Sequence, residues 1–560
     1  MNNTMLTSES WTGDPVDSQV PTSARRFARR SSLVHPPQGK IPAIALAANR
    51  RMQTNRINIL GLACAALAFF TAGTSMAVDN TGSGGTIMYT DSNGANPRPT
   101  TPYDPGYYGG GAGSAGGNGT MKRARPTRAQ VSFHEMELGM FIHFMPTSWF
   151  TKGGIYGDLS RINPTELDTD QWVDVAMSMG AKYIVFVAKH APGFRYWQTD
   201  VTPFGMKQLS WRNGRGDIVA DLAASCSRRG VKLGLYLTAW DGYYGAGEGG
   251  IIGGSSLDAA MKLRGEKLEA TPQAQANYTK IYRRELTEVL SRYGEICEIW
   301  FDGGVQLPVH DIIEKYAPNA MVFSAPCDQP IINPIRWCGN ENGSVNYPLW
   351  NGRHPVRIPE SNPNNPEYFG GDPAGQPWEP VESDTTLRYG PPGYPPKWAW
   401  EPGQENLVRT VDQLMEIYYS SVGRGAVLLL NHTPDPSGRI PEGDARRAAE
   451  FGAEIKRRFG HSLAETQGNG TVLELKLGKP ARIDHVITME DIAQGQRVAE
   501  YVLEGLKGND WGKLAAGCTI GYKKIDRFDP VTVTAVRLRI TKSLEVPVIR
   551  RMAVQGDAEK

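Results

Sequence analysis

The chain has 560 residues, more than one hydrophobic core usually supports, so we expect two ordered domains, one of them large enough to be an α/β barrel. Its 60 Lys and Arg residues nearly balance its 58 Asp and Glu residues, and the formal net charge is +2. A charge this small creates no basic field for a phosphate backbone, so we expect no nucleic-acid partner.

An apolar segment near the start of the chain has the features of a secretory signal peptide. Residues 57–77, INILGLACAALAFFTAGTSMA, have an apolar centre and a small-residue end, and Arg51 and Arg56 precede them. We therefore interpret residues 1–77 as a leader and signal segment and expect export to the periplasm or the extracellular space. Met52 would be a better start, so residues 1–51 read as a misassigned leader.

The same segment could anchor the protein in a membrane if it were not cleaved. Gly and Thr interrupt its apolar run, which is also short for a stable span, so we expect no stable membrane insertion.

The composition changes over residues 78–125 to Gly, Asn, Thr and Pro, including GGGAGSAGGNG. Such a composition buries too little apolar surface to order itself and predicts a disordered linker.

From residue 126 to residue 465, short apolar runs alternate with amphipathic helical patterns. In the helix expected over 170–180, Trp172, Val173, Ala176 and Met179 form one apolar stripe. Apolar strands between amphipathic helices indicate a parallel sheet covered on both faces, so we predict an α/β fold, a (β/α)₈-type (TIM-like) barrel. Seven strands are visible, over residues 138–144, 183–189, 232–238, 298–303, 321–324, 335–339 and 426–431.

Residues 466–560 have a different hydrophobic pattern, in which apolar and polar residues alternate. Short alternating segments such as TVLELKL, RIDHVITM and TVTAVRLRIT are separated by Gly, Asp and Pro. This pattern predicts a small C-terminal all-β sandwich.

Polar side chains follow several of the barrel strands, where the functional groups of such a fold gather. Two carboxylates are among them, as glycoside hydrolysis requires, and their separation would decide between retention and inversion. The histidines could instead be core residues or metal ligands. No third metal ligand has a suggestive spacing, and the six cysteines show no zinc-site pattern, so we expect no metal and no cofactor. The residues are His143, His190, Tyr236, Trp240, Asp302 and Glu341.

Between about residues 130 and 460 the chain resembles glycoside hydrolase family 29, the α-L-fucosidases. The segments that carry the resemblance occur in family order: ELGMFIHFMPTSW, INPTELDTDQW, GAKYIVFVAKHAPGFRYWQTD, GVKLGLYLTAW, EIWFDGG, WCGNENG and GRGAVLLLNHTPDPSGRI. The resemblance implies an exo-acting, retaining hydrolase that releases α-L-fucose from a fucosylated oligosaccharide or glycoconjugate through a covalent glycosyl-enzyme.

The resemblance also implies roles for particular residues. Asp302, in WFDG, would be the nucleophile, and Glu341, in GNENG, would be the acid/base of the subgroup selective for α-1,3- and α-1,4-linked fucose. His143, His190 and Tyr236 would bind the hydroxyls of fucose. Trp337 would lie near the pocket. Trp240, which follows the strand predicted over 232–238, is a further substrate-binding residue that we expect from its position.

The sequence departs from the family pattern at several positions. Where many members have KHHDGF this chain has KHAPGF, so Ala191 replaces a histidine. Phe144 replaces a usual Trp, and a common Glu-Trp pair is missing, for which Asp158 is a weak substitute. Glu382 and Asp384, in PWEPVESDTTLR, are expected in loop structure or subsite binding, with Glu382 as a competing acid/base.

Two other functions stay open. The altered histidine pair favours a retaining glycosidase acting on a related sugar, such as an α-L-galactoside. The chain could also be a catalytically inactive carbohydrate-binding protein, although the presence of both Asp302 and Glu341 argues against it. No oligomeric state follows from the sequence.

Overall fold

The structure of this protein is a computed structural model that describes residues 123–150, 159–324, 330–354, 369–390 and 396–556. The predicted leader and signal segment, nearly all of the predicted linker and Asp158 lie outside these ranges. Within the described ranges, none of the helices has the length and apolar character that a membrane crossing needs.

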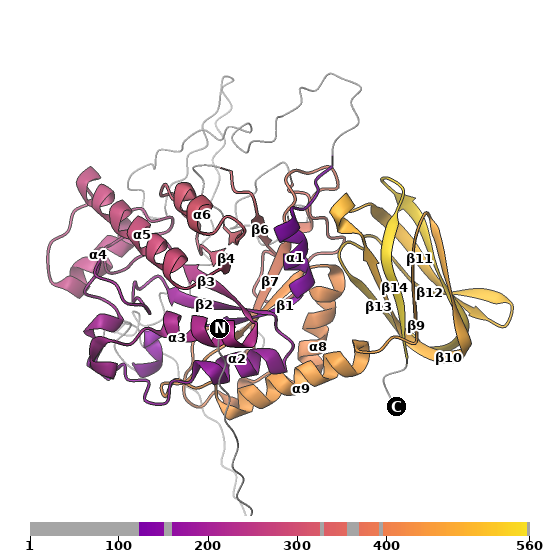
Figure 1. The fold of residues 1–560 in the computed structure, drawn as a ribbon, viewed down its shortest axis with the longest axis horizontal. Coiled ribbons are helices and arrows are strands. Elements are labelled where there is room, and N and C mark those ends of the chain that lie inside the picture. The colour runs from indigo at the N-terminus through magenta and orange to yellow at the C-terminus, as the bar shows by residue number, and fades with distance from the viewer. Residues whose placement is uncertain (1–122, 151–158, 325–329, 355–368, 391–395, 557–560) are drawn as a thin grey trace, which may run out of the picture. The chain divides into compact units, whose positions relative to one another are not determined.

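Eight parallel strands form a closed barrel, as the sequence predicts (Figure 1). Each strand pairs with its neighbours in chain order, and β1 closes the ring by pairing with β8, with Gly139 opposite Leu429. The strands are β1 (Leu138–Ile142), β2 (Tyr183–Lys189), β3 (Lys232–Leu237), β4 (Ile296–Trp300), β5 (Met321–Phe323), β6 (Pro334–Trp337), β7 (Val381–Thr386) and β8 (Val427–His432).

The eighth strand, β7, is absent from the seven-strand prediction. Its sequence, VESDTT, is polar, yet all six of its residues are buried. Glu382 and Asp384 therefore lie in a barrel strand and not in a loop. The prediction failed because hydrophobic periodicity cannot reveal a strand whose buried side chains are mostly polar.

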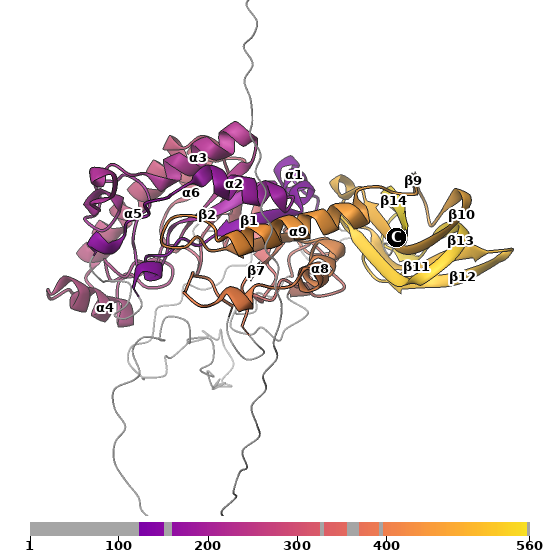
Figure 2. The ribbon, with the colours of Figure 1, turned by 90° about the horizontal axis from the view of Figure 1, so that it is seen from below.

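Helices cover the outside of the barrel strands (Figure 1, Figure 2). In α2 the predicted stripe is buried, and the Asp168 side chain accepts a hydrogen bond from the backbone N–H of Gln171 at 3.0 Å, which caps the helix. The helices are α1 (Arg128–Met136), α2 (Thr169–Ser178), α3 (Ile218–Arg229), α4 (Gly254–Arg264), α5 (Pro272–Arg292), α6 (His310–Tyr316), α8 (Val411–Ser420) and α9 (Glu442–Phe459).

A six-stranded antiparallel sheet follows α9, in the strand order β12-β11-β13-β10-β14-β9. Its β10 has 19 residues and its β13 has 20, so TVLELKL and RIDHVITM are two halves of one strand and not separate strands. A register shift between Lys476 and Ala481 lets the long strand bend there. The strands are β9 (Ala464–Asn469), β10 (Val472–Glu490), β11 (Val498–Lys507), β12 (Asp510–Gly517), β13 (Lys524–Ser543) and β14 (Val548–Gly556).

Candidate active site

The polar residues singled out in the sequence lie at the carboxyl ends of the barrel strands. His143 follows β1, His190 follows β2, Asp302 follows β4 and Glu341 follows β6, while Tyr236 is the second-last residue of β3. Because parallel strands end at the same face of a barrel, their side chains share one mouth. Ring contacts bear this out: the ring centroids of His143 and His190 are 5.9 Å apart, and those of His190 and Tyr236 are 5.2 Å apart.

Asp302 is held by two hydroxyl groups from β3 and the loop after it. The Tyr236 hydroxyl donates to Asp302 Oδ2 at 2.8 Å, and the Thr238 hydroxyl donates to the Asp302 carbonyl at 2.9 Å. Burial, together with the charge of Asp302, raises the pKa of Tyr236 well above its usual range, so this phenol stays protonated and keeps donating. The carboxylate is thus oriented by its neighbours, while Asp302 itself is exposed.

The chain turns sharply directly after Asp302. Gly303 and Gly304 have φ angles of +69° and +74°, in the left-handed region that favours glycine. At Gly303 a Cβ would also lie 2.8 Å from Cγ of Glu248. The two glycines therefore allow the turn directly after Asp302. The missing side chain at Gly303 also makes room for the Glu248 side chain next to this turn.

Glu341 lies in the loop after β6, where the Trp398 indole N–H donates to its Oε2 at 3.1 Å. Burial raises the pKa of Glu341 and the charge of Asp302 raises it further, whereas the hydrogen bond from Trp398 lowers it. Of the two acids, Glu341 is thus partly buried and disposed to keep a proton. This is the environment that a general acid needs.

The loop that carries Glu341 is held by two hydrogen bonds. The Asn340 side chain accepts from the backbone N–H of Asn342 at 3.0 Å, and the Tyr389 hydroxyl donates to the Asn342 side chain at 2.9 Å. Glu341 therefore projects from a fixed turn.

His143 is buried, and its protonation follows from the hydrogen bonds around it. Its Nδ1 lies 2.8 Å from Oδ1 of Asn431, whose amide nitrogen donates to the Trp398 carbonyl at 3.3 Å. That second bond turns the Asn431 oxygen towards the histidine, so Nδ1 carries the proton. Burial lowers the pKa of His143 to about 3, with a further contribution from His190. The ring is neutral, and its Nε2 is a hydrogen-bond acceptor.

His190 has the opposite arrangement. Its Nδ1 accepts a hydrogen bond from the backbone N–H of Ala191 at 2.8 Å, so the proton of the neutral ring lies on Nε2. Burial lowers the pKa of His190, whereas the charge of Asp302 raises it. The ring stacks on Tyr236 with an interplanar angle of 12°. The mouth thus offers one imidazole acceptor and one imidazole donor, a pair suited to hydroxyl groups.

Three tryptophans surround these groups. The Trp337 indole N–H donates to Asp384 Oδ1 at 2.7 Å, and the side chain is half-buried against Phe369. Trp240 is 41% exposed, and its backbone N–H donates to Thr238, the residue that holds the Asp302 carbonyl. Trp398 contacts Glu341 and lies with its ring centroid 5.0 Å from that of His143.

Trp398 and Asn431 were not among the residues identified from the sequence. Asn431 could have been found, because it is a polar residue at the carboxyl end of the apolar β8. Trp398 belongs to the KWAW segment of a long irregular connection, where no periodicity indicates which side chain faces the site.

The two acids of β7 differ in their distance from the mouth. Glu382 is fully buried in the barrel interior, where it accepts hydrogen bonds from the Tyr183 hydroxyl at 2.7 Å and the Trp300 indole at 2.8 Å. A group enclosed in this way cannot reach a glycosidic oxygen, so the competing acid/base interpretation of Glu382 is wrong. Asp384 is buried too, although it lies near the mouth through its bond with Trp337.

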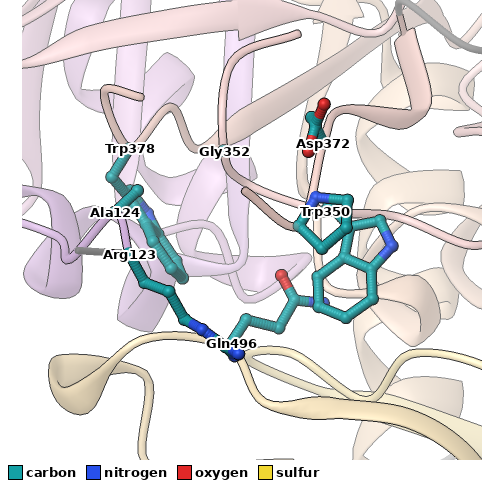
Figure 3. Close-up of a pocket in the computed structure, with 8 residues that line it drawn as sticks. Arg123, Ala124, Trp350, Gly352, Asp372, Trp378 and Gln496 are labelled. Carbon is teal, nitrogen blue, oxygen red and sulfur yellow. The ribbon is translucent and has the colours of Figure 1, made fainter. Parts of the chain in front are cut away.

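Among the residues that the structure describes, no three His, Cys, Asp or Glu side chains gather as a metal site would need. Figure 3 shows a small pocket elsewhere in the described part of the chain. It contains none of the residues above, and it is lined by Arg123, Ala124, Trp350, Gly352, Asp372, Pro373, Trp378 and Gln496.

Comparisons with known proteins agree on one family. A family model described as Alpha-L-fucosidase matches residues 150–458, more than half of this chain. Alpha-L-fucosidase 1 of Arabidopsis thaliana is 28% identical over 483 residues, which cover 77% of this chain and 87% of the plant protein. The crystal structure of a candidate alpha-L-fucosidase from Bacteroides thetaiotaomicron has a TM-score of 0.70 and 35% identity, covering 78% of this chain and 100% of the bacterial chain. A glycoside hydrolase 29 family member from a rumen bacterium has a TM-score of 0.64 and 28% identity, with 77% of each chain covered.

Proposed function

Because this chain belongs to the α-L-fucosidase family, glycoside hydrolase family 29, we propose that it releases α-L-fucose from glycans or glycoconjugates with retention of the anomeric configuration. The chain is an α-L-fucosidase, a glycosidase that hydrolyses an O-glycosyl bond. One observation carries the proposed mechanism: two carboxyl groups with different surroundings, Asp302 and Glu341, stand at one barrel mouth, and the charge of Asp302 contributes to the raised pKa of Glu341.

In the first step, Asp302 attacks the anomeric carbon while Glu341 gives its proton to the departing oxygen. The bond to the leaving group breaks as the bond from the Asp302 oxygen forms, which leaves a glycosyl-enzyme and an ionised Glu341. In the second step, Glu341 takes a proton from water, and the hydroxide attacks the same carbon and releases Asp302. Two inversions at one carbon give net retention.

The surroundings of the two acids support these roles. Asp302 is exposed to an incoming substrate and accepts from the Tyr236 hydroxyl, which orients the carboxyl group as a nucleophile requires. Burial raises the pKa of Glu341, and the charge of Asp302 adds to the effect only until that charge is consumed in the glycosyl-enzyme. The pKa of Glu341 should therefore fall between the two steps, as a residue that is first an acid and then a base requires.

The sugar contacts follow from the imidazoles and the aromatic rings. We infer that Nε2 of His143 accepts from one fucose hydroxyl and that the N–H of His190 donates to another, with Trp398 beside them as an apolar surface. A deoxy sugar presents both kinds of surface, because it has hydroxyls for such hydrogen bonds and a methyl group that an aromatic ring can cover.

We further propose a preference for α-1,3- and α-1,4-linked fucose. The position of Glu341 in GNENG supports it, as does the exposed Trp240 close to the Asp302 loop. An indole next to the nucleophile can stack on the sugar that carries the fucose. Glu248, which reaches Gly303, adds a carboxylate acceptor for hydroxyls on the same side.

The alternative substrate is an α-L-galactoside. The position after His190 carries the small Ala191, where a histidine would occupy more space. A smaller side chain at the mouth favours a sugar with an additional hydroxymethyl oxygen. Comparing kcat/KM on the aryl α-L-fucoside and the aryl α-L-galactoside decides between the two sugars.

We also propose that the protein is exported, on the strength of the 57–77 segment. Fractionation of the producing cells and N-terminal sequencing of the mature chain test this. A mature protein that begins shortly after Ala77 in the exported fraction supports the proposal, and an intact N-terminus in the cytosol contradicts it.

The test of the function itself uses an aryl α-L-fucoside with wild type and Asp302→Asn in parallel, and NMR to follow the product anomer. Turnover that depends on Asp302 and first yields the α-anomer supports the proposal. An initial β-anomer would refute retention. Glycan binding without any turnover by the wild type would favour the inactive sugar-binding protein.

A further inference from the structure

Two carboxyl groups lie in the interior of the barrel, below the active site. Glu298 comes from β4 and Glu382 from β7, and both side chains are fully buried. Their surroundings are apolar and aromatic, including Tyr183 and Trp300. Across the described ranges no Lys, Arg or His forms an ion pair with either group. Two ionised carboxylates in such a place would repel each other without compensation, so at least one of them holds a proton.

The hydrogen bonds indicate which one. Each oxygen of Glu382 already accepts a bond, Oε1 from the Tyr183 hydroxyl and Oε2 from the Trp300 indole. Neither oxygen of Glu298 accepts from any N–H or hydroxyl group of the described residues, and its remaining contact is with the carboxyl group of Glu382. A carboxylate served by two donors is stabilised in its ionised form, so the proton belongs on Glu298, which donates it to Glu382.

Trp300 connects this pair to the nucleophile. Its indole N–H is held by Glu382, while its ring stacks on Phe323 and on Tyr236, with centroids 3.7 Å and 5.6 Å away. Tyr236 in turn donates to Asp302 at 2.8 Å. Trp300 is also separated from Asp302 by a single residue in the chain. A rotation of the indole would therefore move both the phenol that orients the nucleophile and the strand end that carries it.

We propose that Glu298 and Glu382 share one proton in the barrel interior and that Glu382, by fixing the Trp300 indole, is a positioning residue for Asp302. The kinetic consequence rests on the fucosidase function proposed above. The protonation of the pair does not, because it follows from the burial and the donors alone.

The titratable groups that face the pair are few. Tyr183 from β2 and Asp384 from β7 are buried acids and Cys297 from β4 is a half-buried one, and ionisation of any of them would add negative charge. Burial raises the pKa of Glu298 well above its usual range, and the neighbouring Glu382 adds to this rise. The shared proton should therefore persist at a pH where exposed carboxyl groups are ionised.

Difference infrared spectroscopy of the full chain tests the pair without substrate. Wild type minus Glu298→Gln, recorded at a neutral pH, should show one protonated-carboxyl carbonyl band. Loss of an ionised-carboxylate band in its place would overturn the assignment of the proton. This result stands even if the wild type turns over no fucoside, which would refute the proposed function alone.

Kinetics of four variants test the positioning role. Glu298→Gln keeps a neutral N–H donor towards Glu382, so kcat should stay within about twofold of wild type. Trp300→Phe keeps a stacking ring but lacks the N–H, and Glu382→Gln loses the charged acceptor. Both should lower kcat by about tenfold or more with little change in KM, because the nucleophile and not the substrate is displaced. Tyr183→Phe is the matched control, since it removes the other donor to Glu382 and leaves the indole bond in place.

The double variant Glu382→Gln/Trp300→Phe separates this role from a general loss of packing. If both changes break one contact, the double variant should be no slower than the slower single variant. An equal loss of kcat in Glu298→Gln and Glu382→Gln, or a wild-type kcat in Trp300→Phe, would overturn the proposal. Should Glu382→Gln fail to fold, the Trp300→Phe comparison with Tyr183→Phe still decides it.

Discussion

Replacing Asn431 with Asp should make fucosidase activity depend on the protonation of His143. In the wild type, burial holds the pKa of this histidine at about 3, so Nε2 stays an acceptor at any ordinary pH. A carboxylate in place of the Asn431 oxygen, 2.8 Å from Nδ1, would favour the charged ring. At a charge separation of about 4 Å and an effective dielectric constant of about 20, the attraction is about 4 kcal/mol, or about three pKa units. In the variant, the pKa of His143 should therefore rise from about 3 to about 6.

The assay is the ratio of kcat/KM between Asn431→Asp and wild type across the pH range. Since the folded pKa is raised, the variant histidine is charged below it and neutral above it, so the ratio should fall as pH drops through about 6. The variant also loses the hydrogen bond that the Asn431 amide donates to the Trp398 carbonyl. This loss lowers activity equally at every pH, so it leaves the pH dependence of the ratio unchanged. A ratio that is flat with pH, or that rises as pH falls, would refute the assignment of His143 as an acceptor.

Four further predictions concern the acids and the fold. Asp302→Asn should lower turnover on the order of a thousandfold or more without changing Tm, and azide should restore part of the activity of Glu341→Ala. Activity should decline as pH rises through the raised pKa of Glu341. Trp398→Phe removes a hydrogen bond that lowers this pKa, so the alkaline limb of the pH profile should move to higher pH. Glu285→Gln should lower the free energy of unfolding by about 3–5 kcal/mol, measured with denaturant, because two buried cations would be left with one carboxylate, whereas the exposed Asp174→Asn should change it little.

The buried network behind that stability prediction also explains how the mouth is held in shape. Lys189 and Arg195 both pair with Glu285 and Asp241, and all four side chains are fully buried. Lys189 immediately precedes His190, and Asp241 immediately follows Trp240. Two of the loops at the mouth are thus attached to one network of charges, so a loss of balance in it should disturb the site as well as the fold.

How much of the fold was visible in the sequence depended on what each strand buries. β2 buries YIVFVAK, an apolar run whose bounds the sequence predicted to the residue. β7 buries VESDTT and gave no signal, because the segment is polar and its two acids accept hydrogen bonds from Tyr183, Trp300 and Trp337 on other strands. Those donors lie far away in the sequence, so neither periodicity nor composition could reveal that the segment is interior.

The site was predictable where it follows strand ends and unpredictable where it depends on partners. His143 and His190 were both identified, each as the same kind of residue after an apolar strand. Their opposite roles come from their neighbours: Nδ1 of His190 meets the N–H of the next residue, whereas Nδ1 of His143 meets an amide oxygen 288 positions away. That oxygen faces the histidine only because the Asn431 amide is held by the Trp398 carbonyl. Whether an imidazole accepts from the sugar or donates to it is therefore a property of the closed barrel, since β8 must pair with β1 before Asn431 can meet His143.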